Sequence, residues 1–430
     1  MCTTDTQRSA GAIYTADRTL PKEPGDALHH SLAHIARGSE GTLFFQWRQS
    51  RAGAELWHSA MVPHAGPDSR IFREVTEIGE VVSRLGELAG SRVRAQAAVL
   101  HDADCWWALD GPGRPSADLD YPGALRRAHR VLWDAGITAD FAHPADPDLS
   151  RYRVVLAPAL YLLSDTAADA LRAYVHGGGI LLVQHFGGVV DEHHHARLGG
   201  YPAAPLREAL GVRVEEFRPL APDQALRLSD GSTGTVWSES VRTGSGAASE
   251  PQREPGPTAE VVAAYTQGML AGQPALTRHS YGAGTAWYLS TRLDDAAYNA
   301  LLARITDEAG APPELPGAPH SVEAVRRWTQ DGTRCWLFLL NHGNAPVNLP
   351  ASVLGRGHDL LTGQQIGGDG LVLSAGGAAV LRQAEPPGPA VQPRGGAANH
   401  PLDASHPVTG KGALWCRRRR PRLGSKSEAE

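Results

Sequence analysis

The chain has 430 residues, of which 42% are hydrophobic and 20% are charged, so it is long enough for two to four domains with ordinary cores. Its formal net charge of −5 gives no electrostatic basis for a nucleic-acid partner. No apolar run approaches the roughly 18 residues of a membrane span, and the first residues lack the apolar core of a secretory signal.

Two helices and an intervening strand are predicted in the first ninety residues. Residues 24–41 place Leu28, Leu32 and Ile35 at helical spacing, and Gly38 is a suitable end. Residues 42–47, TLFFQW, have the composition of a fully buried strand. A second, amphipathic helix covers residues 70–91, with an apolar stripe formed by Ile71, Val75, Ile78, Val82, Leu85 and Leu88.

From about residue 92 the pattern changes to an alternation of strands and helices. Helices are predicted at 121–137, 166–179 and 294–310, and strands at 92–102, 137–144, 151–165 and 179–188. This alternation predicts βαβ units and a parallel sheet over roughly 92–305. Residues 240–258, rich in Gly, Pro and Ser, are predicted to form a flexible surface insertion.

The last part of the chain predicts a small β domain and a tail. Residues 318–383 contain short apolar strands separated by the turn sequences QDGT and NHGN, which indicates an antiparallel β domain. Residues 385–430 have the composition of a disordered tail. The arginine run at 417–420 could contact an acidic partner, but a solvated tail is favoured because no aromatic residue or period accompanies it.

The stretch 46–58, directly after the predicted strand, is the first candidate site. Polar residues past the carboxyl end of a buried strand are where α/β barrels place their sites. Trp57 offers a flat apolar face for stacking, and Glu55 and His58 can hydrogen-bond sugar hydroxyls. The alternative is a solvated loop with scattered aromatic residues, and spacing alone does not separate the two.

The run of histidines at 193–195 suggests a metal site, on weaker grounds. His193, His194 and His195, beside Asp191 and Glu192, could ligate a metal ion, but adjacent histidines point in different directions and no second cluster completes a site. A solvated loop is therefore favoured, and no metal site is predicted.

The parallel sheet raises the question of amidotransferase chemistry. That reaction needs a cysteine on a sharp turn after a strand, together with a histidine base. The strand ending near residue 184 is followed by His185 and Phe186, and Cys105 has no obvious base. Cys2, Cys105, Cys335 and Cys416 occur singly without zinc-binding spacing, which favours a reducing compartment and hence the cytoplasm.

Three long segments resemble glycoside hydrolase family 42 β-galactosidases. They are KEPGDALHHSLAHIARGSEG, FFQWRQSRAGAELWHSAMVPHAG, and FGGVVDEHHHARLGGYPAAPLREALGVRVEEFRPL. The resemblance covers roughly residues 20–383. It implies a remnant of the last (β/α) unit of a TIM barrel at 1–90, a parallel-sheet trimerisation domain of Rossmann-like or amidotransferase-like type at 91–310, and an antiparallel β domain at 318–384 before the tail at 385–430.

The resemblance also implies the activity and the site residues. Hydrolysis of terminal β-D-galactose residues is expected for the intact family, with a homotrimer formed through residues 91–310 and no cofactor. By position, Glu55, Leu56, Trp57 and His58 would form the sugar-binding segment, while Gln46, Trp47 and Arg48 would support the floor of the pocket.

The catalytic carboxylates of such an enzyme have no clear counterpart in the chain. A retaining glycosidase needs two carboxylates, as nucleophile and as acid/base. The acid/base glutamate has no match, and Ser9-Ala10 places only Asp5 at the nucleophile position, within the unmatched sequence TTDTQR. No catalytic residue is therefore assigned, and an N-terminally truncated family product that is inactive alone is the favoured hypothesis.

Two alternatives remain. The chain is either a non-catalytic trimerisation or assembly module, or a subunit that complements a separately encoded barrel. For the favoured truncated product, residues 42–70 are expected to pack poorly in the isolated chain, with 43–47 exposed.

Overall fold

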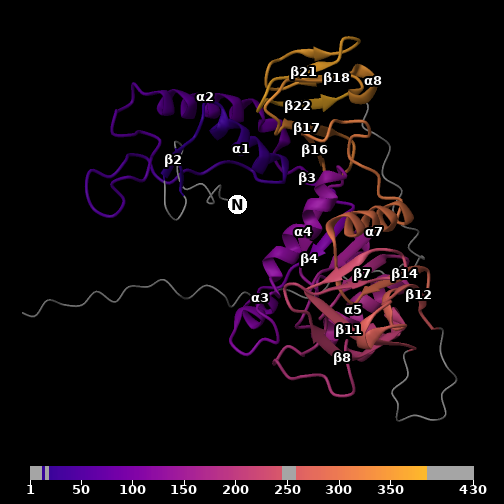
Figure 1. The fold of residues 1–430 in the computed structure, drawn as a ribbon. Coiled ribbons are helices and arrows are strands. Elements are labelled where there is room, and N and C mark those ends of the chain that lie inside the picture. The colour runs from indigo at the N-terminus through magenta and orange to yellow at the C-terminus, as the bar shows by residue number, and fades with distance from the viewer. Residues whose placement is uncertain (1–11, 15–18, 245–257, 385–430) are drawn as a thin grey trace, which may run out of the picture. The chain divides into compact units, whose positions relative to one another are not determined.

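The computed structural model describes residues 12–14, 19–244 and 258–384. The predicted tail at 385–430 and most of the predicted insertion at 240–258 lie outside these ranges. The described residues form a mixed α/β structure that contains both parallel and antiparallel sheets (Figure 1). Within them, no helix has the length and apolar character required to cross a bilayer.

The first section contains the two predicted helices. A short antiparallel pair, β1 (Ala12–Tyr14) and β2 (Thr19–Pro21), precedes helix α1 (Asp26–Ala36). Helix α2 (Arg70–Arg84) begins where the Ser69 hydroxyl accepts a hydrogen bond from the Phe72 N–H, and a 3₁₀ turn, η2 (Gly86–Leu88), follows it. Both predicted helices are confirmed, because their apolar stripes find a surface to pack on.

The predicted buried strand at 42–47 is wrong. These residues have no strand assignment, and Leu43, Phe45 and Trp47 are 51%, 46% and 61% exposed. Instead of joining a sheet, the backbone here accepts hydrogen bonds from the loop segment at 61–62. A strand requires a neighbouring strand to pair its N–H and C=O groups, and none of the described strands lies beside this segment.

The predicted single strand at 92–102 is two strands in two different sheets. Strand β3 (Arg92–Val93) pairs with β16 (Val322–Trp328) of the C-terminal domain. Strand β4 (Ala97–Leu100) belongs to the central sheet. Arg94 lies between the two strands, and its guanidinium donates hydrogen bonds to the carbonyl oxygens of Thr329 and Gln330.

The central section is built on a seven-stranded sheet with the order β12-β13-β14-β7-β6-β4-β5 (Figure 1). Its parallel strands are β4, β5 (Ala139–Ala142), β6 (Val154–Ala157), β7 (Ile180–Gln184) and β14 (Gly284–Leu289). The antiparallel pair β12 (Glu260–Ala264) and β13 (Pro274–Tyr281) extends one edge. The predicted parallel sheet is confirmed, with these two antiparallel strands added.

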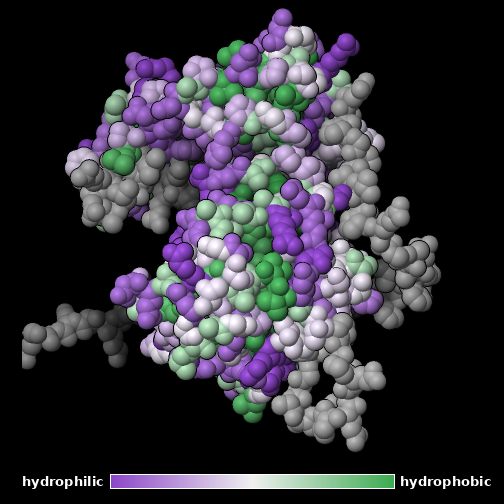
Figure 2. Space-filling model, turned by 45° about the vertical axis from the view of Figure 1, so that its right-hand side comes forward, coloured by the Kyte–Doolittle hydropathy of each residue, from purple (hydrophilic) through white to green (hydrophobic). Residues whose placement is uncertain are grey.

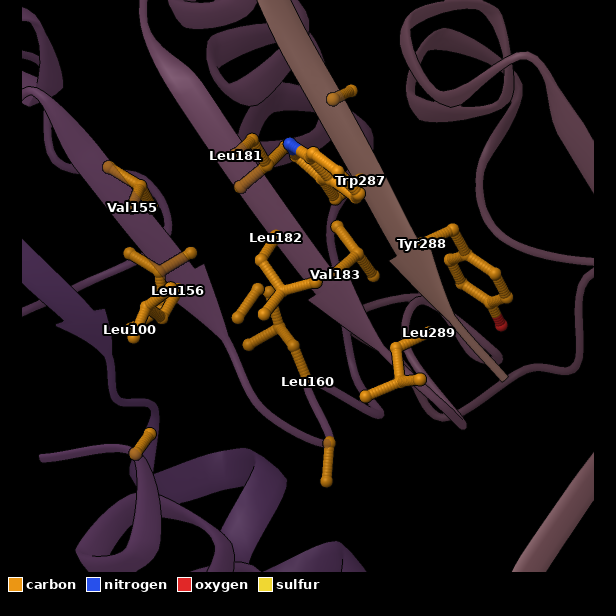
Figure 3. Packing of buried hydrophobic residues seen from close by; sticks show 14 of the residues in the cluster. Leu100, Val155, Leu156, Leu160, Leu181, Leu182, Val183, Trp287, Tyr288 and Leu289 are labelled. Carbon is orange, nitrogen blue, oxygen red and sulfur yellow. The ribbon is translucent and has the colours of Figure 1, made fainter. Parts of the chain in front are cut away.

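Helices and apolar side chains bury the parallel strands. The helices are α3 (Ala103–Asp110), α4 (Tyr121–Asp134), α5 (Asp165–His176), α6 (Ala204–Leu210) and α7 (Asp295–Glu308). Figure 3 shows the side chains of Leu156, Leu182 and Trp287 from neighbouring strands in the shared core. Every residue of β4, β6 and β7 is buried, which is the pattern expected of parallel strands covered on both faces.

The region 186–243 contains elements that the sequence pattern did not predict. Strands β8 (Val212–Pro219) and β11 (Trp237–Thr243) form an antiparallel ribbon with a bulge at Ser240/Val241. A small sheet is formed by β9 (Ala225–Arg227), β10 (Thr233–Thr235) and β15 (Arg292–Leu293). Outside this region, short 3₁₀ turns lie at η3 (Leu149–Arg151) and η4 (Gly268–Leu270).

The C-terminal section is the predicted antiparallel β domain. Its six-stranded sheet has the order β20-β19-β22-β17-β16-β3, and β18 pairs with β21. The remaining elements are β17 (Cys335–Asn341), β18 (Val347–Leu349), α8 (Ala351–Leu354), β19 (Gly357–Asp359), β20 (Gln365–Ile366), β21 (Leu371–Leu373) and β22 (Ala378–Gln383).

The N-terminal helices share one core with this C-terminal sheet. Leu32 and Ile35 of α1 and Leu85 after α2 belong to the same buried cluster as Trp336 and Phe338 of β17. Arg327 of β16 crosses the junction and is 1% exposed. Its guanidinium donates to the carbonyl oxygens of Ile35, Ser39 and Ser91 at 2.8–2.9 Å, and to the Glu40 carboxylate at 2.8 Å.

Replacing Arg327 by Met is expected to lower the free energy of unfolding by about 3 kcal/mol, because it leaves buried carbonyl oxygens without donors. Urea unfolding followed by circular dichroism measures the change. Arg334→Met, at an exposed position of the same domain, is the control and should stay within about 0.5 kcal/mol of the parent. Equal effects of the two substitutions would show that Arg327 does not hold the junction.

Candidate functional site

The loop of residues 42–69 between α1 and α2 is shaped by its own backbone hydrogen bonds (Figure 1). The N–H groups of Met61 and Val62 donate to the carbonyl oxygens of Gln46 and Trp47, both at 2.8 Å, and Gln49 N–H donates to the Val62 carbonyl at 3.0 Å. The loop therefore doubles back, so that residues 46–49 lie beside residues 61–62.

The Gln49 side chain joins the two arms of this loop. Its amide nitrogen donates to the Leu56 carbonyl at 3.2 Å, and its amide oxygen accepts from the His64 N–H at 2.9 Å. The His64 ring contacts the Ser50 carbonyl through Nε2 at 2.8 Å, so Nε2 carries the proton. The Trp57 ring lies edge-on to the His64 ring, with centroids 6.4 Å apart.

A surface hollow of about 430 Å³ lies within this loop. Its lining combines cationic, amide, imidazole and apolar groups from Arg48, Gln49, Arg51, Leu56, Trp57, Pro63 and His64. Trp57 is 71% exposed, which leaves its ring accessible for stacking. These side chains can donate hydrogen bonds to hydroxyl or carboxylate oxygens, and no carboxylate is among the described residues that line the hollow.

The structure brings together only part of the predicted sugar-binding segment. Leu56 and Trp57 line the hollow, whereas Glu55 is exposed and His58 is half-buried outside the lining. The His58 N–H donates to the Glu55 carbonyl at 3.0 Å, which closes a turn around Leu56 and Trp57. Sequence reasoning missed Pro63 and His64, because their proximity to Gln49 depends on the path of the loop.

The position that corresponds to the nucleophile of the family, which was not assigned as catalytic, lies outside the described residues. Asp5, together with Ser9 and Ala10, lies outside the described residues. The residues that line the hollow in the 42–69 loop are therefore given without Asp5.

The histidine run forms an exposed loop, as expected. Asp191 accepts hydrogen bonds from the N–H groups of His193 and His195 at 2.9 and 2.8 Å, and these bonds hold its pKa below the ordinary value. His194 contacts the Tyr161 hydroxyl at 3.0 Å. In the described part of the chain, no group of three or more His, Cys, Asp or Glu side chains is placed to hold a metal ion.

The sharp turn after β7 carries no nucleophile. Phe186 occupies it with φ of 59°, and its N–H donates to Glu239 at 2.7 Å. Glu239 is fully buried and also accepts from Trp237, Tyr201 and Tyr288. Burial raises the pKa of Glu239, and these donors oppose the effect.

Cys105 is not activated either. Its thiol donates to the Leu162 carbonyl at 3.1 Å, and burial raises its pKa to about 12. A second hollow of about 420 Å³ lies nearby, at the carboxyl ends of β4 and β5. There the Asp102 carboxylate and His143 Nε2 are 3.9 Å apart, and none of the residues that line the hollow is a cysteine.

Three family profiles match consecutive parts of the chain. They describe a β-galactosidase over residues 4–85, a β-galactosidase trimerisation domain over 95–312 and a β-galactosidase C-terminal domain over 321–383. These ranges follow the three structural sections closely. The profile for the trimerisation domain alone covers half of the 430 residues.

Individual relatives agree with the profiles. A β-galactosidase of Arthrobacter sp. is 41% identical over 377 residues, which are 88% of this chain and 51% of the relative. A Geobacillus β-galactosidase is 36% identical, over 85% of this chain and 52% of the relative. The crystal structure of a Bacillus circulans β-galactosidase superposes with a TM-score of 0.78 at 29% identity, over 87% of this chain and 54% of that one. The chain thus spans about half the length of the relatives it matches.

Replacing Gln49 by Ala is expected to increase amide hydrogen exchange of residues 56–64 about tenfold, because two hydrogen bonds that join the arms of the loop are lost. Mass spectrometry of deuterated peptides measures the rate. Gln267→Ala, which removes a single bond to the Ala225 carbonyl on another surface, is the control and should leave this segment unchanged. An unchanged rate in Gln49→Ala would mean that backbone bonds alone hold the loop.

Proposed function

Because the chain belongs to the glycoside hydrolase family 42 β-galactosidases, we propose that it contributes a sugar-binding loop, the trimerisation domain and the C-terminal domain to an enzyme of that family. The proposed reaction of the whole protein is hydrolysis of terminal non-reducing β-D-galactose residues. The names of the relatives and the agreement of the three profiles with the three structural sections support this proposal.

The hollow in the loop at 42–69 is the proposed contact for the sugar. The face of Trp57 suits the apolar side of a pyranose ring, while Gln49 and His64 supply polar groups within the same hollow. Glu55, Leu56, Trp57 and His58 form one turn, so Glu55 and His58 flank the two residues that line it. Their carboxylate and imidazole groups are proposed to bind sugar hydroxyls at the rim.

The 430-residue chain by itself is proposed to be inactive as a glycosidase. Retaining hydrolysis needs one carboxylate to attack the anomeric carbon and a second, about 5–5.5 Å away, to protonate the leaving group. Among the residues that the structure describes, those that line the hollow carry cationic, amide, imidazole and apolar groups, and none of them carries a carboxylate. This composition of the described lining is the observation that carries the proposal.

Residues 91–310 are proposed to form a homotrimer. The family description of this segment supports a trimer, and exposed apolar side chains offer contact surfaces: Trp107, Phe141, Leu198, Phe217 and Met269. Figure 2 shows hydrophobic residues gathered in small groups among hydrophilic ones on one face of the molecule. The unpaired buried thiols Cys105 and Cys335 fit the proposed location in the reducing cytoplasm.

One observation favours a second candidate, in which the chain complements a separate protein. Leu43, Phe45 and Trp47 are all at least 46% exposed within one short segment. Large apolar side chains grouped on a surface often mark a contact with another protein. In that case activity would appear only when a chain that carries the two carboxylates is added.

Purified 430-residue chain is expected to hydrolyse a nitrophenyl β-galactoside no faster than a buffer blank, while sedimenting with the mass of three chains. A full-length relative run in parallel is the positive control. Activity on addition of a separately produced family barrel would favour complementation.

Turnover by the purified chain that is lost in Glu55→Gln or Asp5→Asn would overturn the assignment of an inactive chain. A monomer in sedimentation would overturn the assembly proposal separately, since that measurement does not depend on catalysis.

A further inference from the structure

The hollow of about 420 Å³ beside α3 lies where the strand order of the central sheet reverses. Strand β4 has β5 on one side and β6 on the other, although the chain forms β5 and β6 one after the other. In open parallel sheets, ligands bind outside the carboxyl ends of the strands at such a point. The lining agrees with this rule, because His101 and Asp102 directly follow β4 and His143 directly follows β5.

A hydrogen-bond donor and an acceptor lie close together in this hollow, just beyond bonding distance. The Nδ1 of His143 accepts from the Ala145 N–H at 3.1 Å, so the ring carries its proton on Nε2. This Nε2 lies 3.9 Å from Oδ2 of Asp102, which is too far for a hydrogen bond. The other oxygen of Asp102, Oδ1, accepts from the Asp104 N–H at 2.9 Å, which fixes the carboxylate at the start of α3.

A single hydroxyl group can satisfy both of these atoms. Its oxygen accepts from the His143 Nε2–H and its hydrogen is donated to Asp102, since a gap of 3.9 Å admits an oxygen about 2.8 Å from each. An ammonium group has only donors, so it gives the Nε2–H no acceptor. An anion is repelled by the carboxylates of Asp102 and Asp104, which both line the hollow. The pair therefore favours a neutral ligand that carries hydroxyl groups.

Two aromatic side chains supply the apolar part of the same hollow. Trp107 of α3 is 68% exposed and Phe141 of β5 is 54% exposed. The Phe141 ring stacks on that of His129 of α4, with centroids 5.4 Å apart and an angle of 16° between the planes, so one of its faces is covered. A flat aromatic side chain beside groups that bind hydroxyls suits a pyranose, because one face of that ring is apolar and its edge carries hydroxyls.

We propose that this hollow is a second sugar-binding site and that it binds a pyranose. One hydroxyl of the sugar bridges His143 and Asp102, while the apolar face of the ring lies on Trp107. The site is distinct from the one proposed in the loop at 42–69, because the two hollows share no lining residue. It also gives Trp107 a role other than contact with a neighbouring protomer.

Binding of methyl β-D-galactopyranoside to the full chain tests the aromatic half of the site. Saturation-transfer difference NMR measures it, in a Trp57→Ala background that removes the ring proposed to stack on sugar in the loop at 42–69. Adding Trp107→Ala is expected to weaken binding about tenfold, because the stacking face is lost. Trp106→Ala is the matched control, since Trp106 is the preceding residue of α3, is 44% exposed and is not among the residues that line the hollow.

Two further measurements test the hydroxyl-binding half. His143→Ala removes the donor of the bridge and should also weaken binding of the galactoside about tenfold. Sorbitol carries hydroxyl groups but has no ring face, so it should compete poorly with the galactoside. Because the side chains of Trp107 and His143 are exposed, thermal unfolding of both variants should match that of the parent.

Several outcomes would overturn the proposal. They are the absence of a galactoside signal in the Trp57→Ala chain, equal losses in Trp106→Ala and Trp107→Ala, and competition by sorbitol as strong as by the galactoside itself. A Trp107→Ala chain that sediments at a lower mass but keeps the galactoside signal would assign Trp107 to a protomer contact instead. The loop at 42–69 is tested separately, by the difference between the parent and Trp57→Ala, so failure of one site does not imply failure of the other.

Discussion

The buried guanidinium of Arg327 is the interaction on which the arrangement of the first and last parts of the chain depends. A charge that is 1% exposed is costly unless its donors find acceptors, and here the two terminal nitrogens find four acceptors in two separate segments, while Nε has none. The segments are residues 35–40, at and just after the end of α1, and Ser91 before β3. Because these groups must converge on one side chain of β16, the N-terminal helices are fixed to the C-terminal sheet.

The loop of residues 42–69, which holds the candidate site, begins at this junction. Its first residues follow Ser39 and Glu40, which Arg327 holds, and it ends at Ser69, which caps α2. Between these fixed ends the loop satisfies its backbone internally and through Gln49. The side chains of Leu43, Phe45 and Trp47 remain largely exposed, and the Trp47 ring lies edge-on to that of Phe72, with centroids 6.0 Å apart.

The elements that are predicted correctly are those whose own sequence carries the signal. Helices α1, α2 and α4 have apolar stripes, and α2 and α4 have side-chain caps, such as the Asp120 carboxylate that accepts from Gly123 N–H. The buried composition of residues 42–47 was misleading, because composition indicates where a side chain would be stable but does not supply a pairing strand. The division of 92–102 into β3 and β4 depends on a pairing with residues 327–328, far away in sequence.

The candidate site, too, depends on contacts that the local sequence does not reveal. Trp57 and Leu56 were identified by resemblance and do line the hollow, while His64 was missed because only the folded loop brings it to Gln49. Glu239 gave no signal in the sequence, although it satisfies the backbone of Phe186 at the turn after β7. Trp237 is two residues away, but Phe186, Tyr201 and Tyr288 are 38 to 53 residues away in the chain, so a local pattern does not reveal them.

Helix α1 is tied to the C-terminal domain at both of its ends. Near its last turn, the guanidinium of Arg327 donates to the carbonyl oxygens of Ile35 and Ser39, and a guanidinium stays protonated at any pH the protein meets. In its first turn, the His29 ring contacts the Gly376 carbonyl and the His342 ring. The loop at 42–69 therefore follows a helix that is held at both ends, so the path of the loop starts from a fixed point on the sheet.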